Sequence, residues 1–284
     1  MMTSYEQVLA HAQQGRVHAY DTAKLQLYGV GVGLGSDPTD PRQLAFLRDD
    51  DPRVLPSFAT VAAFDVDFQL QLGIDWSKLL HASQSVKLHR QLPSAGELIA
   101  DTQIEAVYDK PTRNASLLVT STKLRLAGSE ALLGEMRSIS LARDFRVAGA
   151  PTGAPEALAA PPAHAPDLEA LIPTSPQVAL IYRLLGGRSL IHFDPEVALA
   201  QGFQQPVMHG LSTWGHACHG IVAEVLQYDS TRMSSFAANF SAPMYPGETL
   251  RLRMWLAPGQ VHFEGYAAER GKKVLGNGVA RFSV

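Results

Sequence analysis

The stretch "HGLSTWGHACHGIVAEVL", residues 209–226, predicts one long helix with a buried face. Three segments of alternating apolar and polar residues follow it, at 248–256, 260–269 and 273–284, and such alternation is typical of strands. A helix followed by long antiparallel strands is the order expected when a sheet wraps around a helix. The helical face rests on large apolar residues that recur at spacings of three and four: Leu211, Trp214, Cys218, Ile221, Val222 and Val225.

The first part of the chain repeats this order. Its segment "LPSAGELIADTQIEAVYD" (92–109) matches "MYPGETLRLRMWLAPG" (244–259), since in both a proline and a Gly-Glu turn lead into an alternating strand. A Leu-Gly pair then recurs in "ALLGEMRSISLAR" (131–143) and "KVLGNGVARFSV" (273–284). The apolar stretch "LPSFATVAAF" (55–64) is the helix candidate of this half, and strands are expected at 97–109, 115–127 and 131–143. We therefore predict a duplicated α+β unit.

A segment rich in proline and alanine separates the two parts. It reads "VAGAPTGAPEALAAPPAHAPD" (147–167) and has few large apolar groups to bury, so it predicts a stiff, extended connection on the surface. The expected organisation is an N-terminal domain at 1–148, a linker at 149–167 and a C-terminal domain at 168–284.

Composition and charge narrow the class of protein. Hydrophobic residues make up 46% of the 284 residues and charged residues 18%, which is typical of a globular protein with a filled core. The net charge of −3 offers no basic field for nucleic acid. Cys218 is the single cysteine, so no intrachain disulfide can form. With no apolar run of signal-peptide or membrane-spanning length, we expect a soluble protein of the cytoplasm.

Several long segments resemble a known family. Residues 28–47 ("YGVGVGLGSDPTDPRQLAFL"), 182–215 and 240–250 ("FSAPMYPGETL") are similar, in the same order, to the MaoC-like (R)-specific 2-enoyl-CoA hydratases, which include the hydratase part of the peroxisomal multifunctional enzyme. The resemblance covers nearly the whole chain. It implies a double hot dog, in which each half is an antiparallel sheet wrapped around a central helix. It also implies an acyl-CoA substrate and no cofactor besides the coenzyme A that the substrate carries.

The segment "YRLLGGRSLIHFD" (182–194) carries the family's signature in altered form. Family members hydrate a trans-2-enoyl-CoA with an Asp and a His that act as paired acid and base on one water. The resemblance gives His192 as that histidine, but the aspartate position holds Gly187, which has no side chain for proton transfer. Ser189 replaces an asparagine and Leu190 a proline. In "LLHASQS" (79–85), Ser83 stands where family members often have a glutamate.

The resemblance also gives the remaining site residues. The "HGL" segment opens the central helix, and its glycine amide, here that of Gly210, polarises the thioester carbonyl in the family. This agrees with the physics of helix N-termini, whose free N–H groups favour a developing oxyanion. We predict His192, Ser189 and Gly210 as catalytic residues. The predicted substrate-binding residues are Gly187, Tyr182, His209, Trp214 and Ser83.

Other features have simpler interpretations. His209, His216 and His219 share a helix face, but no carboxylate or thiolate completes a set of metal ligands, so packing or pocket lining is expected. Asp194 is expected to cap the helix that starts at Pro195. "GVGVGLG" (29–35) lacks the spacing of a dinucleotide fingerprint and predicts a flexible loop at the pocket edge.

Three hypotheses for the function remain open at this point. The first is a hydro-lyase that uses His192 with an unidentified partner group or a second water. The second is an acyl-CoA-binding protein without hydratase chemistry, which serves as a subunit of an active paralogue. The third is an enzyme of changed specificity, in which Gly187 and Leu190 give room to a bulky or branched acyl group. We expect a homodimer or a hetero-oligomer with an intact paralogue.

Overall fold

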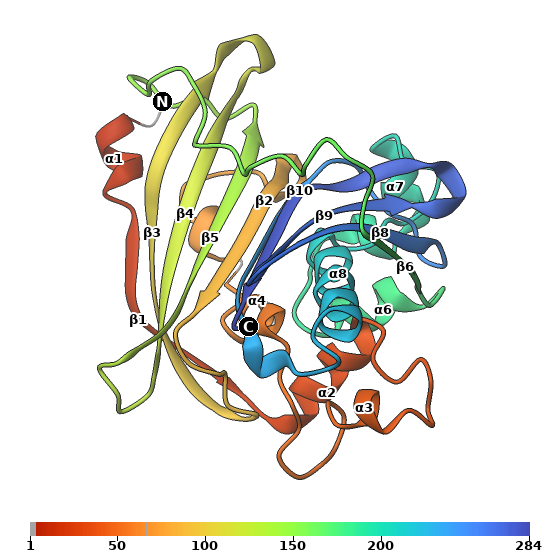
Figure 1. Ribbon diagram of the computed structural model, residues 1–284. Helices are drawn as coiled ribbons and strands as arrows, with labels where there is room; N and C mark the ends of the chain where they lie inside the picture. Colours follow the sequence, from red (N-terminus) through yellow and green to blue (C-terminus); the bar gives the residue numbers. More distant parts are fainter. Residues whose placement is uncertain (1–3, 66) are drawn as a thin grey trace.

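The computed structural model describes residues 4–65 and 67–284, and one antiparallel sheet of ten strands organises them (Figure 1). The strands pair in the order β1-β3-β4-β5-β2-β7-β10-β9-β8-β6. From the central β2–β7 pair outward, each half has the same order of strands. The chain is therefore a duplicated α+β unit, as the sequence predicts.

The first half contains five strands and several short helices. Its elements are α1 (Tyr5–Leu9), β1 (Ala12–Tyr20), α2 (Thr22–Gly31), α3 (Pro41–Leu44), η1 (Pro56–Phe58), α4 (Ala59–Ala62), α5 (Asp67–Leu70), η2 (Trp76–Lys78), β2 (Leu79–Leu88), β3 (Gly96–Lys110), η3 (Pro111–Arg113), β4 (Ala115–Leu126) and β5 (Leu132–Arg143).

The second half contains the other five strands and the longest helix. Its elements are β6 (Leu168–Pro173), α6 (Val178–Arg183), η4 (Leu190–His192), α7 (Pro195–Ala200), α8 (Gly210–Glu224), η5 (Ser230–Arg232), β7 (Met233–Phe240), β8 (Thr249–Ala257), β9 (Gln260–Ala267), η6 (Ala268–Arg270) and β10 (Lys272–Phe282). The predicted helix at 209–226 corresponds to α8, and the six predicted strands correspond to β3, β4, β5, β8, β9 and β10.

Helix α8 forms the core of the second half. Trp214, Cys218 and Ile221 have no exposed surface, and neither do Leu252 and Phe263 on the strands of the same half. These side chains belong to one apolar cluster, and complete burial of each large one is worth about 1.5–3 kcal/mol. The helical periodicity in the sequence therefore predicts the buried side of α8 correctly.

The two halves differ in what covers the concave face of the sheet. The predicted helix at 55–64 is present only as a 3-10 turn, η1, and the four-residue helix α4. α8 has fifteen residues. Much of the concave face of the first half is consequently left free of a covering helix.

The glycine-rich segment 29–35 corrects a prediction. Gly29 and Gly31 lie inside α2 and are buried, and a Cβ on Gly31 would lie 3.4 Å from the Tyr182 ring. Gly31 thus lies against α6, whereas a Cβ on Gly29 would lie 2.8 Å from the Leu47 side chain, so Gly29 permits close packing of α2 on the segment that follows it. The segment does not line the cavity between the halves and is no pocket-edge loop.

The Pro/Ala-rich connection crosses the surface of the sheet without regular structure from residue 154 to residue 167 (Figure 1). Asn277 Nδ2 donates a hydrogen bond to the Leu158 carbonyl at 3.2 Å, and Trp255 Nε1 donates one to the His164 carbonyl at 2.8 Å. The connection is therefore fixed to the second half. Across residues 4–65 and 67–284, no helix has the length and apolar character needed to span a membrane.

Candidate active site

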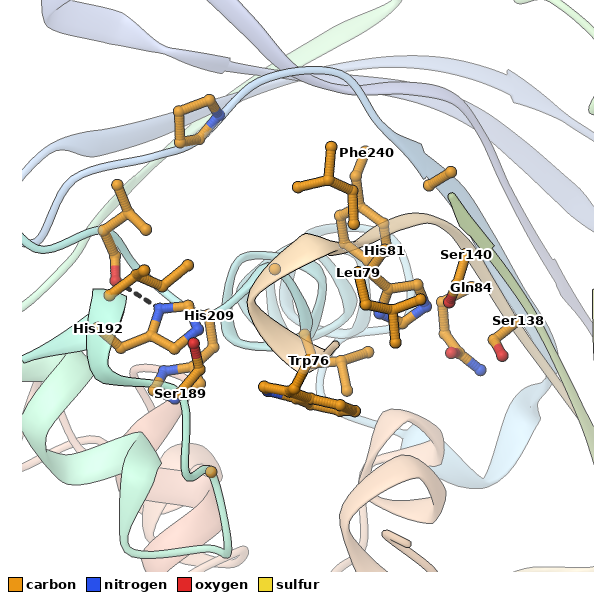
Figure 2. Close-up of a pocket in the computed structure, with 18 of the residues that line it drawn as sticks. Trp76, Leu79, His81, Gln84, Ser138, Ser140, Ser189, His192, His209 and Phe240 are labelled. Atoms are coloured by element: carbon orange, nitrogen blue, oxygen red, sulfur yellow. Dashed lines mark hydrogen bonds between the residues drawn. The ribbon is translucent and has the colours of Figure 1, made fainter. Parts of the chain in front are cut away.

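A cavity of about 1270 Å³ lies between the two halves and is lined by both. One wall comes from β2, β4 and β5, and the other from residues 187–192, the start of α8 and residues 240–244. Figure 2 shows His192, His209 and Ser189 on one side of this space and His81, Gln84, Ser138 and Ser140 on the other. The volume is above the usual range of small-molecule pockets, about 300–1,000 Å³, so the cavity can hold more than a short acyl chain.

His192 lies at the end of η4 with a fixed orientation. Its Nδ1 is 2.9 Å from the Val207 carbonyl oxygen (Figure 2). A carbonyl only accepts hydrogen bonds, so Nδ1 carries the proton and Nε2 carries the lone pair. Burial lowers the pKa of His192 to about 4, against a weaker raising effect of the bond to Val207. The imidazole is therefore neutral at physiological pH and presents a free base at Nε2.

Gly210 begins helix α8 at the cavity wall. The first amides of a helix have no partner within it, and the helix dipole makes this end positive. A Cβ on Gly210 would lie 3.3 Å from the Phe240 ring, so glycine is the residue that fits this approach. The Met208 amide donates to the Met244 carbonyl at 2.8 Å and holds the preceding segment in place. The arrangement suits an anionic oxygen on the amides of the first turn.

His209 precedes α8 and stacks on His192. Their ring centroids are 3.7 Å apart, with 25° between the ring planes. Neither ring nitrogen of His209 has a hydrogen-bond partner among the described residues. Burial lowers the pKa of His209 to about 2, with a smaller contribution from the neighbouring His192. His209 is therefore neutral, with one donor and one acceptor nitrogen unused.

Gly187 lies directly against this second imidazole. A Cβ on Gly187 would lie 2.6 Å from His209 Nε2, closer than two such atoms can approach. The space next to the backbone of residue 187 is thus occupied by the His209 ring. The structure brings the predicted residues His192, Gly187, Gly210 and His209 together at one end of the cavity.

Tyr182 and Ser189 also line this end. The Tyr182 hydroxyl is buried and has no partner among the described residues, and its ring centroid is 5.2 Å from that of His209. Burial raises the pKa of Tyr182, so the hydroxyl stays protonated and can donate. Ser189 immediately precedes η4, and its hydroxyl accepts no capping hydrogen bond from the amides of η4. Both residues thus lie in the cavity, and their predicted roles in binding and catalysis stay predictions.

Among the described residues that line the cavity, Asp65 is the one carboxylate. The sequence analysis did not single it out. Its Oδ2 lies 3.6 Å from Arg16 Nε, and its Oδ1 accepts a hydrogen bond from the Asp67 amide at 2.8 Å. The carboxylate is therefore held by its own half of the molecule.

The structure corrects two predicted substrate-binding residues. Trp214 has no exposed surface and packs on Phe236 with ring centroids 4.7 Å apart, so it belongs to the core of the second half. Ser83 donates to the Ala238 carbonyl at 3.3 Å and faces a separate small hollow beneath the connection between the halves. A register shift between His81 and Ser83 causes this, because it changes which residues of β2 face the cavity.

The remaining histidines of α8, His216 and His219, are buried inside the fold. His216 Nδ1 lies 2.8 Å from the Ser212 carbonyl oxygen and His219 Nδ1 lies 3.0 Å from that of Val32. No group of three His, Cys, Asp or Glu side chains in the described residues could hold a metal ion. Cys218 is buried, which raises its thiol pKa to about 11. Asp194 accepts hydrogen bonds from the Glu196 and Val197 amides, and its predicted capping role is confirmed.

Polar residues on the wall opposite His192 were missed by the sequence analysis. They are His81, Gln84, Thr120, Thr122, Ser138 and Ser140, and all of them line the cavity. The signal was present as alternating Ser and Thr in "SLLVTST" (116–122) and "RSIS" (137–140). Alternation alone, however, does not tell which face of a strand is the inner one.

Comparison with known proteins agrees with this architecture. Residues 157–277 match the MaoC-like domain and residues 18–142 match the MFE-2 hydratase 2 N-terminal domain. The chain is 37% identical over 272 residues to enoyl-CoA hydratase ChsH3 of Mycobacterium tuberculosis, with 92% of each chain covered. It is 32% identical over 267 residues to the 3-hydroxyacyl-thioester dehydratase Y of the same organism, with 90% of each chain covered.

A solved structure gives the same result for the fold. The crystal structure of a MaoC-like dehydratase from Phytophthora capsici superposes with a TM-score of 0.85 and 26% identity, covering 99% of this chain and 98% of that one. The double hot-dog fold is thereby confirmed. The extent and identity of these matches show that the chain belongs to the MaoC-like family of enoyl-CoA hydratases and dehydratases.

Proposed function

We propose that the protein is an (R)-specific hydro-lyase that adds water to the double bond of a trans-2-enoyl-CoA, or removes it in the reverse reaction. The observation that supports this most is His192, whose Nδ1–H bond to Val207 leaves a lone pair on Nε2 in the cavity that also contains the start of α8. A base and an oxyanion site in one cavity are what this reaction needs.

The chemical steps follow from these two groups. The thioester carbonyl binds the amides at Gly210, which stabilise the enolate oxygen as the double bond is attacked. Water bound at His192 Nε2 gives up a proton to that nitrogen while its oxygen bonds to C3. The His192 imidazolium then returns the proton to C2, and the enolate collapses to the 3-hydroxyacyl thioester. At the end of the cycle the imidazole of His192 is neutral again, and the protein has neither gained nor lost a proton.

His209 has a supporting role in this proposal. Its ring lies against Gly187, where a family member would hold a carboxylate, and both of its nitrogens are buried without a hydrogen-bond partner among the described residues. In the proposed reaction the ring turns toward the cavity, and its neutral imidazole donates one N–H to the attacking water and holds it beside His192. It cannot supply the charge of a carboxylate, so we propose turnover about 10²–10⁴-fold below that of a complete Asp/His pair.

A second candidate is an acyl-CoA-binding protein without turnover, which serves as a subunit of an active paralogue that carries out the catalysis. The absence of a side chain at Gly187 favours it. Large exposed apolar side chains in the second half support a protein partner, whether a second copy or a paralogue: Leu171, Leu180, Leu184, Leu190 and Leu199.

The test is an assay of the hydration of crotonyl-CoA and longer enoyl-CoAs, in which the loss of the enoyl absorbance is measured. We expect slow hydration by the wild type and none by His192→Ala, with little change in melting temperature. His164→Ala, an exposed histidine of the connection, is the matched control and should keep the wild-type rate. Equal rates for His192→Ala and wild type would remove the proposed base. Tight acyl-CoA binding with no hydration would favour the second candidate.

The proposal also covers the cofactor requirement, the oligomeric state and the cellular location of the protein. We propose that the reaction needs no cofactor beyond the coenzyme A of the substrate, which activity after exhaustive dialysis with a chelator would test. A homodimer is proposed, to be checked by light scattering. The proposed location is the cytoplasm, supported by the single buried thiol of Cys218.

A further inference from the structure

We propose that the concave face of the first-half sheet is a binding subsite for neutral oxygen groups, such as hydroxyl or keto groups, on the part of the acyl chain farthest from the thioester. This concave polar face consists of His81, Gln84, Thr120, Thr122, Ser138 and Ser140. The inference rests on the proposed function in one respect, since it takes the thioester to lie at Gly210.

The strand register gathers these residues into one patch. Gln84 pairs with Ser138, and Ser138 pairs with Thr120 on the next strand. His81 pairs with Ser140 in the neighbouring row. Residues directly opposite each other in a sheet point to the same face, so the six side chains face the cavity together. Figure 2 shows four of them, His81, Gln84, Ser138 and Ser140, on the side away from His192.

In the second half of the chain, the equivalent face of the sheet is apolar and packs against α8. There the sheet places Leu250, Leu252, Met254 and Phe263 in the apolar cluster with α8, and none of them is exposed. The first half has only the four-residue helices α4 and α5 beside this face, and Gln69 of α5 donates a hydrogen bond to Thr120 Oγ1 at 3.3 Å. Among the described residues of the first half, no helix as long as α8 covers the rest of the polar face, which is therefore open to a ligand.

Part of the hydrogen-bonding capacity of the patch is not used by the protein. Gln84 Nε2 donates to the Ser85 carbonyl oxygen at 2.9 Å, but the hydroxyls of Ser138 and Ser140 make no side-chain hydrogen bond within the described residues, although Ser140 is only 5% exposed. His81 Nε2 is buried without a partner in the same set. An acyl chain without oxygen would bury these groups unsatisfied, at a cost of several-fold to about 100-fold in affinity for each.

The patch is also uncharged. Burial lowers the pKa of His81 to about 4, so at neutral pH it is a neutral donor and acceptor like the serines and threonines around it. Neutral groups complement a hydroxyl or ketone better than a carboxylate. Between the patch and His192, Trp76 and Leu79 line the cavity (Figure 2). The occupant therefore has an apolar middle and a polar far end.

Binding measurements with two saturated acyl-CoAs test the inference without requiring turnover. The two share a long or ring-bearing carbon skeleton, and one of them carries hydroxyl or keto groups at the far end. Calorimetry should show that the oxygenated compound binds wild-type protein roughly 100-fold more tightly, about 5-fold for each of the three groups that it satisfies. The double variant Ser138→Ala/Ser140→Ala should lose most of this preference, because each neutral hydrogen bond is worth roughly 5-fold.

Controls separate this subsite from other roles. Ser121→Ala removes a hydroxyl from the strand position adjacent to Thr120, on the opposite face of β4, and should keep the preference. Thr120→Val, which keeps the side-chain shape, is a second test if the double variant is unstable. Equal wild-type affinity for the two compounds would overturn the inference. So would an equal loss of butyryl-CoA binding in the variants, which would assign the patch to the pantetheine arm. Failure to hydrate crotonyl-CoA would count against the proposed function alone.

Discussion

Replacing Gly187 tests whether the position of His209 matters to the reaction. A Cβ at residue 187 would lie 2.6 Å from His209 Nε2 and 3.2 Å from its Cδ2, whereas ordinary contacts begin near 3.4 Å. The ring must therefore retreat by about 1 Å, and a misplacement of ~1 Å can cost ~10²-fold in rate. We expect Gly187→Ala to lower the hydration rate by about that factor. Overpacking of the buried ring should also lower the free energy of unfolding by about 1–3 kcal/mol.

Gly187→Asp makes the same steric change and adds a carboxylate. It should be more active than Gly187→Ala, because a carboxylate beside His209 and His192 can share the proton of the attacking water. Recovery should be partial, and should increase when Ser189→Asn and Leu190→Pro restore the family's loop. The measurements are steady-state hydration rates and thermal unfolding of the wild type, Gly187→Ala, Gly187→Asp and the triple variant that adds Ser189→Asn and Leu190→Pro. An unchanged rate in Gly187→Ala would refute the role given to His209, and equal rates for the Ala and Asp variants would refute the idea of a missing acid.

Three further predictions concern the partner group and the effect of pH. His209→Ala should lower hydration about 10²-fold, while Asp65→Asn should change it little; the reverse order would make Asp65 the partner of His192. The kcat/KM should stay level as pH falls from 8 to 5 and decline near pH 4, because the pKa of His192 is lowered to about 4 and its neutral form is the base; a decline centred at pH 6.5 would contradict this. The melting temperature should fall as pH drops below 6.5. Several buried histidines have lowered pKa values in the folded protein, so the unfolded chain binds protons at a higher pH than the folded one; these are His81, His192, His209 and His216. Circular dichroism melts at pH 7 and pH 5 measure this difference.

Much of the fold could be predicted because its signals are local. The strands β3, β4, β5, β8, β9 and β10 show clear alternation, and α8 shows clear helical periodicity. Four strands, β1, β2, β6 and β7, were not identified, and of these β2 and β7 join the halves. β7 reads "MSSFAANF", with small residues in place of large alternating ones, and β2 places His81 and Gln84 on its inner face. A strand whose inner face is polar or small lacks the pattern by which strands are found.

The errors at the site have structural causes that a single sequence does not reveal. Residues 212–222 of α8 are buried on all sides. The helical periodicity therefore predicts that Trp214 is buried, but it does not tell whether Trp214 contacts a ligand or the sheet. Ser83 was placed in the pocket by resemblance, and the register shift in β2 turns it outward. His209 was expected to bind substrate. Its position against Gly187 depends on the fold, because the two residues lie twenty-two positions apart in the chain.

The absence of a side chain at Gly187 and the low pKa of His192 are linked electrostatically in the mechanism that we propose. A carboxylate within ~4–6 Å would favour the imidazolium and raise the pKa of His192. With no side chain at residue 187, burial acts almost unopposed, and the pKa of His192 falls to about 4. A weaker base removes a proton from water more slowly, but its conjugate acid returns the proton to C2 more readily. In the mechanism that we propose, Gly187 therefore shifts the difficult step of hydration toward activation of water, the step in which a hydrogen bond from His209 can assist.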